Sequence, residues 1–166
     1  MTSTISAQPL TALTVTRAAG REYQLTDEHG RVCACLRVGW PARRGEISIE
    51  PDSWPVHRHV RGQVTAGDSD EPLVRLSRAQ SVVPGPEPDT NWVITRNLRT
   101  YYATLTRASA NIEIDLPALS GRRFAIKLTG DWERRDLVLL TACFALLARR
   151  RRDIAIMIAT SSSHGS

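Results

Sequence analysis

Residues 137–148, with the sequence LVLLTACFALLA, would be apolar on every side if wound into an α-helix. A helix without a polar face cannot lie on a protein surface, so it has to be surrounded. At 1.5 Å per residue the run spans about 18 Å, which is shorter than the roughly 20 residues needed to cross a bilayer core. We therefore expect the protein's own chain to wrap this helix.

The flanks of this run carry signals for a helix start and a helix end. Gly130-Asp131 offers an N-cap, and Glu133 and Asp136 place negative charge near the positive end of the helix dipole. The run is closed by Arg149 to Arg152, where cations complement the other end of the dipole. Residues 154–159 could continue the helix or form a closing strand, and the alternating isoleucines favour a strand.

Upstream of the helix, apolar residues alternate with polar ones in many short segments, which is the pattern of strands with one buried face. Residues 23–25 and 31–38 form one such hairpin, because the intervening Asp27 to Gly30 supplies turn chemistry. In its second arm Val32, Ala34, Leu36 and Val38 share the apolar face. The other predicted strands centre on residues 13–16, 47–49, 74–77, 92–96, 99–106, 111–116 and 124–129.

These segments predict a mainly β fold: an antiparallel β-barrel, or a strongly curled sheet, of about 9–12 strands enclosing one hydrophobic C-terminal α-helix. The 166 residues fit one domain. We expect residues 1–10 to be a flexible N-terminal segment, residues 11–160 to form the single barrel domain, and residues 161–166 to be a disordered tail.

Composition bears on the compartment. Three cysteines, Cys33, Cys35 and Cys143, are an odd number and too few for a disulfide framework, which favours a reducing environment. Residues 1–9 lack the basic start and apolar run of a secretory signal. We therefore expect a cytoplasmic protein, and one that could associate peripherally with a membrane because its formal charge is +5.

A run of β-hairpins followed by one hydrophobic C-terminal helix resembles the tubby C-terminal-like superfamily, which includes tubby proteins, phospholipid scramblases and LURP-one-related proteins. The similar segments are the hairpin at residues 23–32, the Phe124 to Lys127 strand before Gly130-Asp131-Trp132, and residues 137–148. The resemblance implies a closed barrel threaded by the helix and a role at lipid headgroups. The phosphoinositide-binding residues of tubby proteins and the calcium-binding and palmitoylated segments of scramblases find no matching positions here.

The candidate lipid-binding or anion-binding residues are Arg149, Arg150, Arg151 and Arg152. Four consecutive arginines put positive charge on every side of one helical turn and could hold anionic headgroups at a membrane surface. The same arginines could equally be the polar plug of a buried helix that emerges from a barrel. Further basic pairs at residues 43–44, 122–123 and 134–135 could gather at one rim if the barrel closes.

A zinc site is a separate hypothesis. Cys33, Cys35, His57 and His59 could form a tetrahedral set if their strands were neighbours, although the spacing is not that of a zinc knuckle. We expect no metal and no cofactor. The sequence has no nucleophile elbow, no cysteine beside a plausible base and no Gly-rich phosphate loop, so we expect no catalytic residues and no enzymatic activity.

These observations favour a non-enzymatic binding module that recognises anionic phospholipid headgroups, or a protein partner, at a membrane surface. The few aromatic residues do not interleave with the arginines in the sequence, which argues against nucleic acid. One alternative is a lipocalin-like carrier, with the helix packed outside the barrel and a small apolar ligand inside it. Another is insertion of residues 137–148 into one bilayer leaflet.

Overall fold

The computed structural model of the chain describes residues 9–40, 42–85 and 89–163, which form eleven strands, one short 3₁₀ helix and one long α-helix. The strands are β1 (Thr11–Ala19), β2 (Glu22–Thr26), β3 (Val32–Val38), β4 (Arg44–Ile49), β5 (Asp52–Arg58), β6 (Val64–Gly67), β7 (Pro72–Leu76), β8 (Asn91–Arg96), β9 (Thr100–Thr106), β10 (Asn111–Pro117) and β11 (Arg123–Thr129). The helices are η1 (Val60–Gly62) and α1 (Arg135–Ser162).

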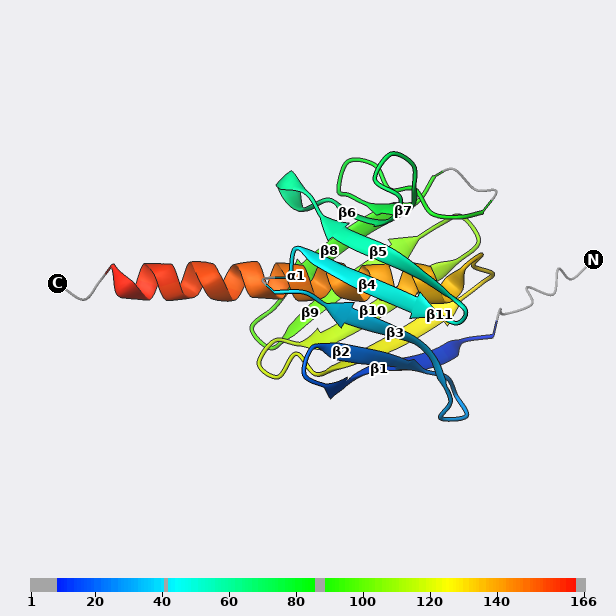
Figure 1. The fold of residues 1–166 in the computed structure, drawn as a ribbon, viewed down its shortest axis with the longest axis horizontal. Coiled ribbons are helices and arrows are strands. Elements are labelled where there is room, and N and C mark those ends of the chain that lie inside the picture. The colour runs from blue at the N-terminus through cyan, green and yellow to red at the C-terminus, as the bar shows by residue number, and fades with distance from the viewer. Residues whose placement is uncertain (1–8, 41, 86–88, 164–166) are drawn as a thin grey trace, which may run out of the picture.

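All strands belong to one antiparallel sheet with the order β7-β6-β5-β4-β3-β2-β1-β11-β10-β9-β8. Most neighbours are consecutive in the chain, and the exception is the pairing of β1 with β11. The sheet curls into a nearly closed barrel (Figure 1). The two edge strands, β7 and β8, are linked across the seam by isolated bridges from Arg75 to Val82 and from Ser81 to Thr90.

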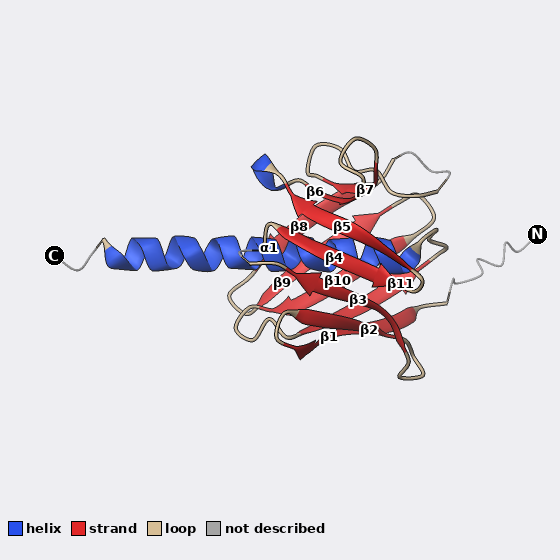
Figure 2. Ribbon diagram, viewed as in Figure 1, coloured by secondary structure: helices blue, strands red, loops and turns tan. Residues whose placement is uncertain are grey.

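Helix α1 runs along the inside of the barrel (Figure 2). Every residue from Leu137 to Ala148 is buried, and contacts of α1 reach β3, β4, β5, β6, β7 and β9. The predicted enclosure of this segment by the sheet is thereby confirmed. A helix outside an empty barrel, on which the carrier alternative depends, is not the observed arrangement, and residues 137–148 are not available for insertion into a leaflet.

The inner face of the sheet leaves room for the helix. Alternate residues of most strands point inward, and Leu25, Leu36, Ile114 and Phe124 are fully buried among them. Gly45 is required at the closest approach, because a Cβ there would lie 2.6 Å from the Arg37 carbonyl oxygen and 3.2 Å from the ring of Phe144 on α1. The apolar residues that alternate along the predicted strands therefore form the surface against which α1 packs.

The C-terminal part of the chain differs from the prediction. Residues 154–159 are helical and not a strand, because α1 continues to Ser162 without a Gly or Pro to stop it. Arg149 to Arg152 consequently lie in the middle of the helix, so they do not complement its C-terminal dipole. The predicted N-cap is also wrong: Arg134 occupies that position in a left-handed conformation, with no side-chain capping bond. Asp136 lies in the first turn as expected.

Two strands escaped prediction. Strand β5 contains Pro55, which usually argues against an interior strand. It is tolerated because β6 pairs with β5 only from Val56 to Arg58, beyond the proline. Strand β6 has four residues that are all buried, so it shows no alternation. Val32 is also misassigned, since its side chain is exposed at the start of β3 while Ala34, Leu36 and Val38 are buried as expected.

The expected terminal segments fall mostly outside the described residues, namely 1–8 and 164–166. Residues 161 and 162, assigned to a tail from the sequence, belong to α1. Within the described part of the chain, no helix has an apolar stretch long enough to cross a membrane.

Candidate functional site

The end of the barrel at which α1 leaves the sheet is the candidate site, and we call it the exit rim. It consists of the connections β1–β2, β3–β4, β5–β6, β8–β9 and β10–β11, together with the end of β7 (Figure 1). The antiparallel meander brings these connections together because every second turn of such a sheet lies at the same end.

Arginines are concentrated at the exit rim. Those in its connections or within three residues of the adjoining strand ends are Arg17, Arg21, Arg37, Arg43, Arg44, Arg58, Arg61, Arg75, Arg78, Arg96, Arg99, Arg122 and Arg123, and α1 adds Arg149 to Arg152. Of the described carboxylates, those near this rim belong to Glu22, Glu46, Asp115 and Asp153. Of the three basic pairs that could have met at one rim, residues 43–44 and 122–123 therefore do so, and residues 134–135 do not.

The opposite rim carries most of the acidic side chains. They are Asp27, Glu28, Glu50, Asp52, Asp68, Asp70, Glu71, Asp89, Asp131, Glu133 and Asp136. Arg134 and Arg135 lie at this end with the start of α1, and Arg135 pairs with Asp136 at 3.3 Å. The molecule is therefore electrically polarised along its barrel axis, with the positive end where α1 emerges.

The four helix arginines point in different directions, because successive helical residues are about 100° apart. Arg150 serves the fold: its guanidinium donates to the carbonyl oxygens of Ala118 at 2.8 Å and Leu119 at 2.9 Å. Gly121 makes room for this contact, since a Cβ there would lie 2.7 Å from the Arg150 guanidinium carbon. Arg150 thus ties the β10–β11 connection to α1.

Arg149 joins a small network around the only described carboxylate on the emerging helix. Asp153 lies 3.4 Å from Arg149 and 3.2 Å from Arg96, and it accepts a hydrogen bond from the Tyr101 hydroxyl at 2.8 Å. Burial and then this hydrogen bond raise the pKa of Tyr101 to about 12. The network fixes α1 against the β8–β9 side of the rim.

Arg151 lies over an exposed tryptophan. Its guanidinium is 3.3 Å from the ring centroid of Trp40, and that of Arg21 is 5.3 Å from the same ring. These residues line a cavity of about 350 Å³ together with Arg17 and Ile154. Burial, and then the charges of Arg21 and Arg150, lower the pKa of Arg151. No described carboxylate lies within ion-pair distance of Arg151, so this cavity is a cationic one.

Arg152 faces the seam of the barrel. A cavity of about 180 Å³ there is also lined by Arg58, Arg61 and Arg78, with Ala145 and Ala148 of α1 at its base. Burial, and then the charges of Arg152 and Arg43, lower the pKa of Arg58. Like charges crowded in this way repel, so a bound anion would be stabilised by several arginines at once.

Large apolar side chains also stand at the exit rim. Four of its connections expose one each: Trp40 at 65%, Val60 at 88%, Leu98 at 96% and Leu119 at 92%. Each is one to four residues from an arginine of the same connection. Because apolar and basic side chains alternate around the rim, this end of the barrel differs from an ordinary solvated charged face.

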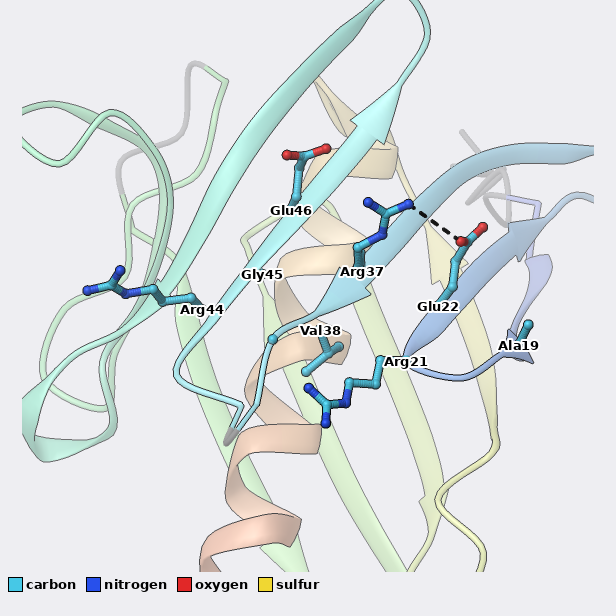
Figure 3. A pocket seen from close by; sticks show the side chains of 9 residues that line it. Ala19, Arg21, Glu22, Arg37, Val38, Arg44, Gly45 and Glu46 are labelled. Atoms are coloured by element: carbon cyan, nitrogen blue, oxygen red, sulfur yellow. Dashed lines mark ion pairs between the residues drawn. The ribbon is translucent and has the colours of Figure 1, made fainter.

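A further hollow lies at the β1–β2 and β3–β4 side of the exit rim and shows no catalytic grouping among its lining residues. It has a volume of about 570 Å³ and is lined by the ends of β1, β2, β3 and β4 and by Arg21 and Gly39 of their connections (Figure 3). Its ionic contact joins Arg37 to Glu22 at 3.9 Å, and both side chains are substantially exposed. Such an exposed ion pair contributes little to stability.

The zinc candidates are not brought together. Cys33 and Cys35 lie on β3, whereas His57 lies on β5 and His59 just beyond it, so that β4 separates the two pairs. His59 is engaged with the Thr65 hydroxyl at 2.7 Å. In residues 9–40, 42–85 and 89–163, no group of three or more His, Cys, Asp or Glu side chains could hold a metal ion.

Protein-family models, curated proteins and solved structures were each compared with the chain, and none of them matches it. The resemblance to the tubby C-terminal-like superfamily therefore stays a prediction. The functional assignment has to rest on the physical chemistry of the exit rim.

The contact made by Arg150 leads to a stability prediction. We expect Arg150→Met to lower the free energy of unfolding by about 2 kcal/mol, because two charge-assisted hydrogen bonds are lost. Urea unfolding measures this effect. Arg122→Met is the matched control, since the Arg122 side chain is exposed and forms no ion pair within the described part of the chain, so the change should alter stability by less than about 0.5 kcal/mol. Equal stability of both variants would show that the contact does not hold the β10–β11 connection.

Proposed function

We propose that the protein is a non-enzymatic module that docks its exit rim on the anionic surface of a membrane. The observation that carries this proposal is the coincidence, at one end of the barrel, of the arginine-rich rim with the exposed Trp40, Val60, Leu98 and Leu119. Each basic side chain near an anionic surface contributes about 1 kcal/mol of attraction. The opposite, acidic rim would then face away from the surface.

The apolar side chains favour a bilayer over other anions. A phosphate backbone offers no partner for leucine and valine at the tips of connections, whereas the boundary between headgroups and acyl chains accepts them. Tryptophan is enriched at that boundary because its ring is apolar and its N–H is polar. A membrane therefore satisfies both kinds of side chain at the rim, and a nucleic acid satisfies the arginines alone.

This proposal includes Arg149, Arg151 and Arg152 as lipid-binding residues, and it assigns Arg150 mainly to the fold. It is consistent with the superfamily resemblance and with a cytoplasmic protein that associates peripherally with membranes. Because α1 fills the barrel, we do not pursue the carrier alternative, which needs an empty interior.

Co-sedimentation with vesicles of phosphatidylcholine and phosphatidylserine tests the proposal. We expect the full chain to sediment with these vesicles in low salt and to bind phosphatidylcholine alone much more weakly. Most of the binding should fade as the ionic strength rises, because the Debye length falls from about 10 Å at 0.1 M to about 3 Å at 1 M.

Paired charge reversals at the two rims provide the control. The double variant Arg43→Glu, Arg122→Glu loses four units of positive charge. Its affinity for the vesicles should fall at least about tenfold, which removes most of the sedimentation. Arg31→Glu with Lys127→Glu changes the net charge equally away from the exit rim and should bind like the wild type. Absence of vesicle binding by the wild type, with retention on single-stranded RNA, would overturn the membrane proposal. Equal loss in both variants would show that net charge alone governs binding.

A further inference from the structure

Helix α1 continues beyond the exit rim (Figure 1), and several apolar side chains of this part are exposed to solvent. In this projecting half, Ile154 is 37% exposed, Ile156 52%, Met157 57% and Ile158 62%. Arginines precede this band and hydroxyl residues follow it. A helix that stands alone in water has no tertiary packing to stabilise it, and exposed apolar groups are typical of a surface that binds a partner. We therefore expect a partner to cover this part of α1.

One face of the projecting helix is continuous with one side of the rim. Residues at i, i+3 and i+4 share a helix face, so Ile154, Met157 and Ile158 lie together. One turn earlier this face carries Arg150, which contacts the β10–β11 connection, and Arg151, which contacts Trp40. Ile154 lines the same cavity as Trp40. The apolar face therefore extends the side of the rim that exposes Trp40 and Leu119.

The other side of the helix is different. Ile156 lies about 200° from Ile154 around the helix. Asp153 lies at the edge of this side, one turn before Met157, and it is directed to Arg96 and Tyr101 of β8 and β9. A carboxylate on this side disfavours contact with an anionic surface. The emerging helix thus has one side suited to such a surface and one side tied to the barrel.

The hydroxyl residues beyond the band already use their donors within the helix. Thr160 donates to the Ile156 carbonyl at 2.9 Å, Ser161 to that of Met157 at 2.8 Å and Ser162 to that of Ile158 at 2.9 Å. Donors satisfied in this way lower the cost of placing a helix in an apolar medium. The carbonyls of the last turn remain polar, which favours a shallow, oblique position over a vertical one.

We propose that the face formed by Ile154, Met157 and Ile158 inserts obliquely into one leaflet of an anionic bilayer, with Trp40 and Leu119 beside it. This inference rests on the proposed docking of the exit rim and adds the depth and direction of that docking. Residues 154–159 span about 9 Å along the helix, which matches the 5–10 Å to which interfacial helices bury their apolar surface. The arginines at the rim would stop the barrel at the headgroups.

Charge selects the bilayer over a second copy of the chain as the occupant. Two copies that joined through their projecting helices would bring two arginine-rich rims together, and such like charges repel. An anionic surface instead attracts the same rim.

The test separates insertion from electrostatic docking. Vesicles contain phosphatidylserine with either ordinary or acyl-brominated phosphatidylcholine, and the full chain is studied in low salt and in about 1 M salt. We expect the wild type to keep a salt-resistant bound fraction and to show bromine quenching of tryptophan fluorescence. Met157→Ser with Ile158→Ser should lower the salt-resistant affinity about tenfold or more, because two large side chains lose their transfer to the leaflet.

Ile156→Ser is the matched control on the other helix face and should retain wild-type binding and quenching. Trp40→Phe should remove most of the quenching, which identifies Trp40 as the reporter. If the wild type binds in low salt without quenching and without a salt-resistant fraction, insertion is refuted while docking of the rim stands. An equal loss of salt-resistant affinity in Ile156→Ser refutes the proposed face. If the wild type dimerises without lipid and the Met157→Ser, Ile158→Ser variant does not, the face binds a second copy of the chain instead. If even low-salt binding is absent, the proposed function itself fails.

Discussion

A chain that stops after Asp136 is expected to lose its cooperative fold and to become insoluble or molten. Residues 137–148 are buried throughout and form the centre of the core. At about 1.5–3 kcal/mol for each of the seven large apolar side chains, their burial contributes about 10–20 kcal/mol, which is as large as the 5–15 kcal/mol by which domains are stable. Far-ultraviolet circular dichroism and two-dimensional NMR of the shortened chain measure the loss.

The control for this truncation is a chain that stops after Asp153. It lacks the projecting half of α1 but keeps Arg150, Asp153 and their contacts with the barrel. We expect its free energy of unfolding to lie within about 1 kcal/mol of the full chain, because exposed residues contribute little. Cys143 should resist alkylation in this shorter chain, since burial raises the pKa of its thiol. A well-folded chain ending at Asp136 would refute the view that α1 is the core.

Leu137→Ala and Leu139→Ala are each expected to destabilise the protein by about 2–5 kcal/mol. These residues lie about 200° apart around the helix, so they pack against different parts of the wall. Both are fully buried. On an amphipathic helix one of two such positions would be exposed and its truncation nearly neutral, so similar large losses at both are specific to an enclosed helix.

Urea denaturation of the two variants gives the magnitudes, and Ile156→Ala serves as the reference. Ile156 belongs to the same helix but is 52% exposed beyond the rim. We expect its substitution to change the free energy of unfolding by less than about 0.5 kcal/mol. A neutral result at either Leu137 or Leu139 would mean that the wall does not surround the helix.

The enclosed helix and most of the wall could be predicted because their residues have simple periodicities. Residues 137–148 lack any polar face, and strands such as β10 and β11 alternate strictly. The failures have local causes. Strand β6 is buried on both faces and β5 contains Pro55, so neither shows the usual pattern. The isoleucines at 154, 156 and 158 imitate a strand but continue a helix that had already begun.

The candidate site was less predictable because it is assembled from distant connections. Arg149 to Arg152 were recognisable as a block, but their separate contacts with Asp153, Leu119 and Trp40 depend on which connections surround the helix. Leu98 and Leu119 look like ordinary connection residues in the sequence. Their exposure beside arginines could have been inferred only by recognising that alternate turns of an antiparallel barrel meet at one end.

The pairing of β1 with β11 has a consequence for the order of events during synthesis. Strand β1 can pair with β2 early, but its second partner, β11, is complete only when Thr129 has been translated. The interior of the barrel stays unfilled until residues 137–148 follow. During synthesis the apolar face of the hairpins is therefore exposed before helix α1, which covers it, has been made. The steps that close the barrel and fill it join segments distant in the sequence, and such contacts form slowly, which gives chaperones an interval in which to bind.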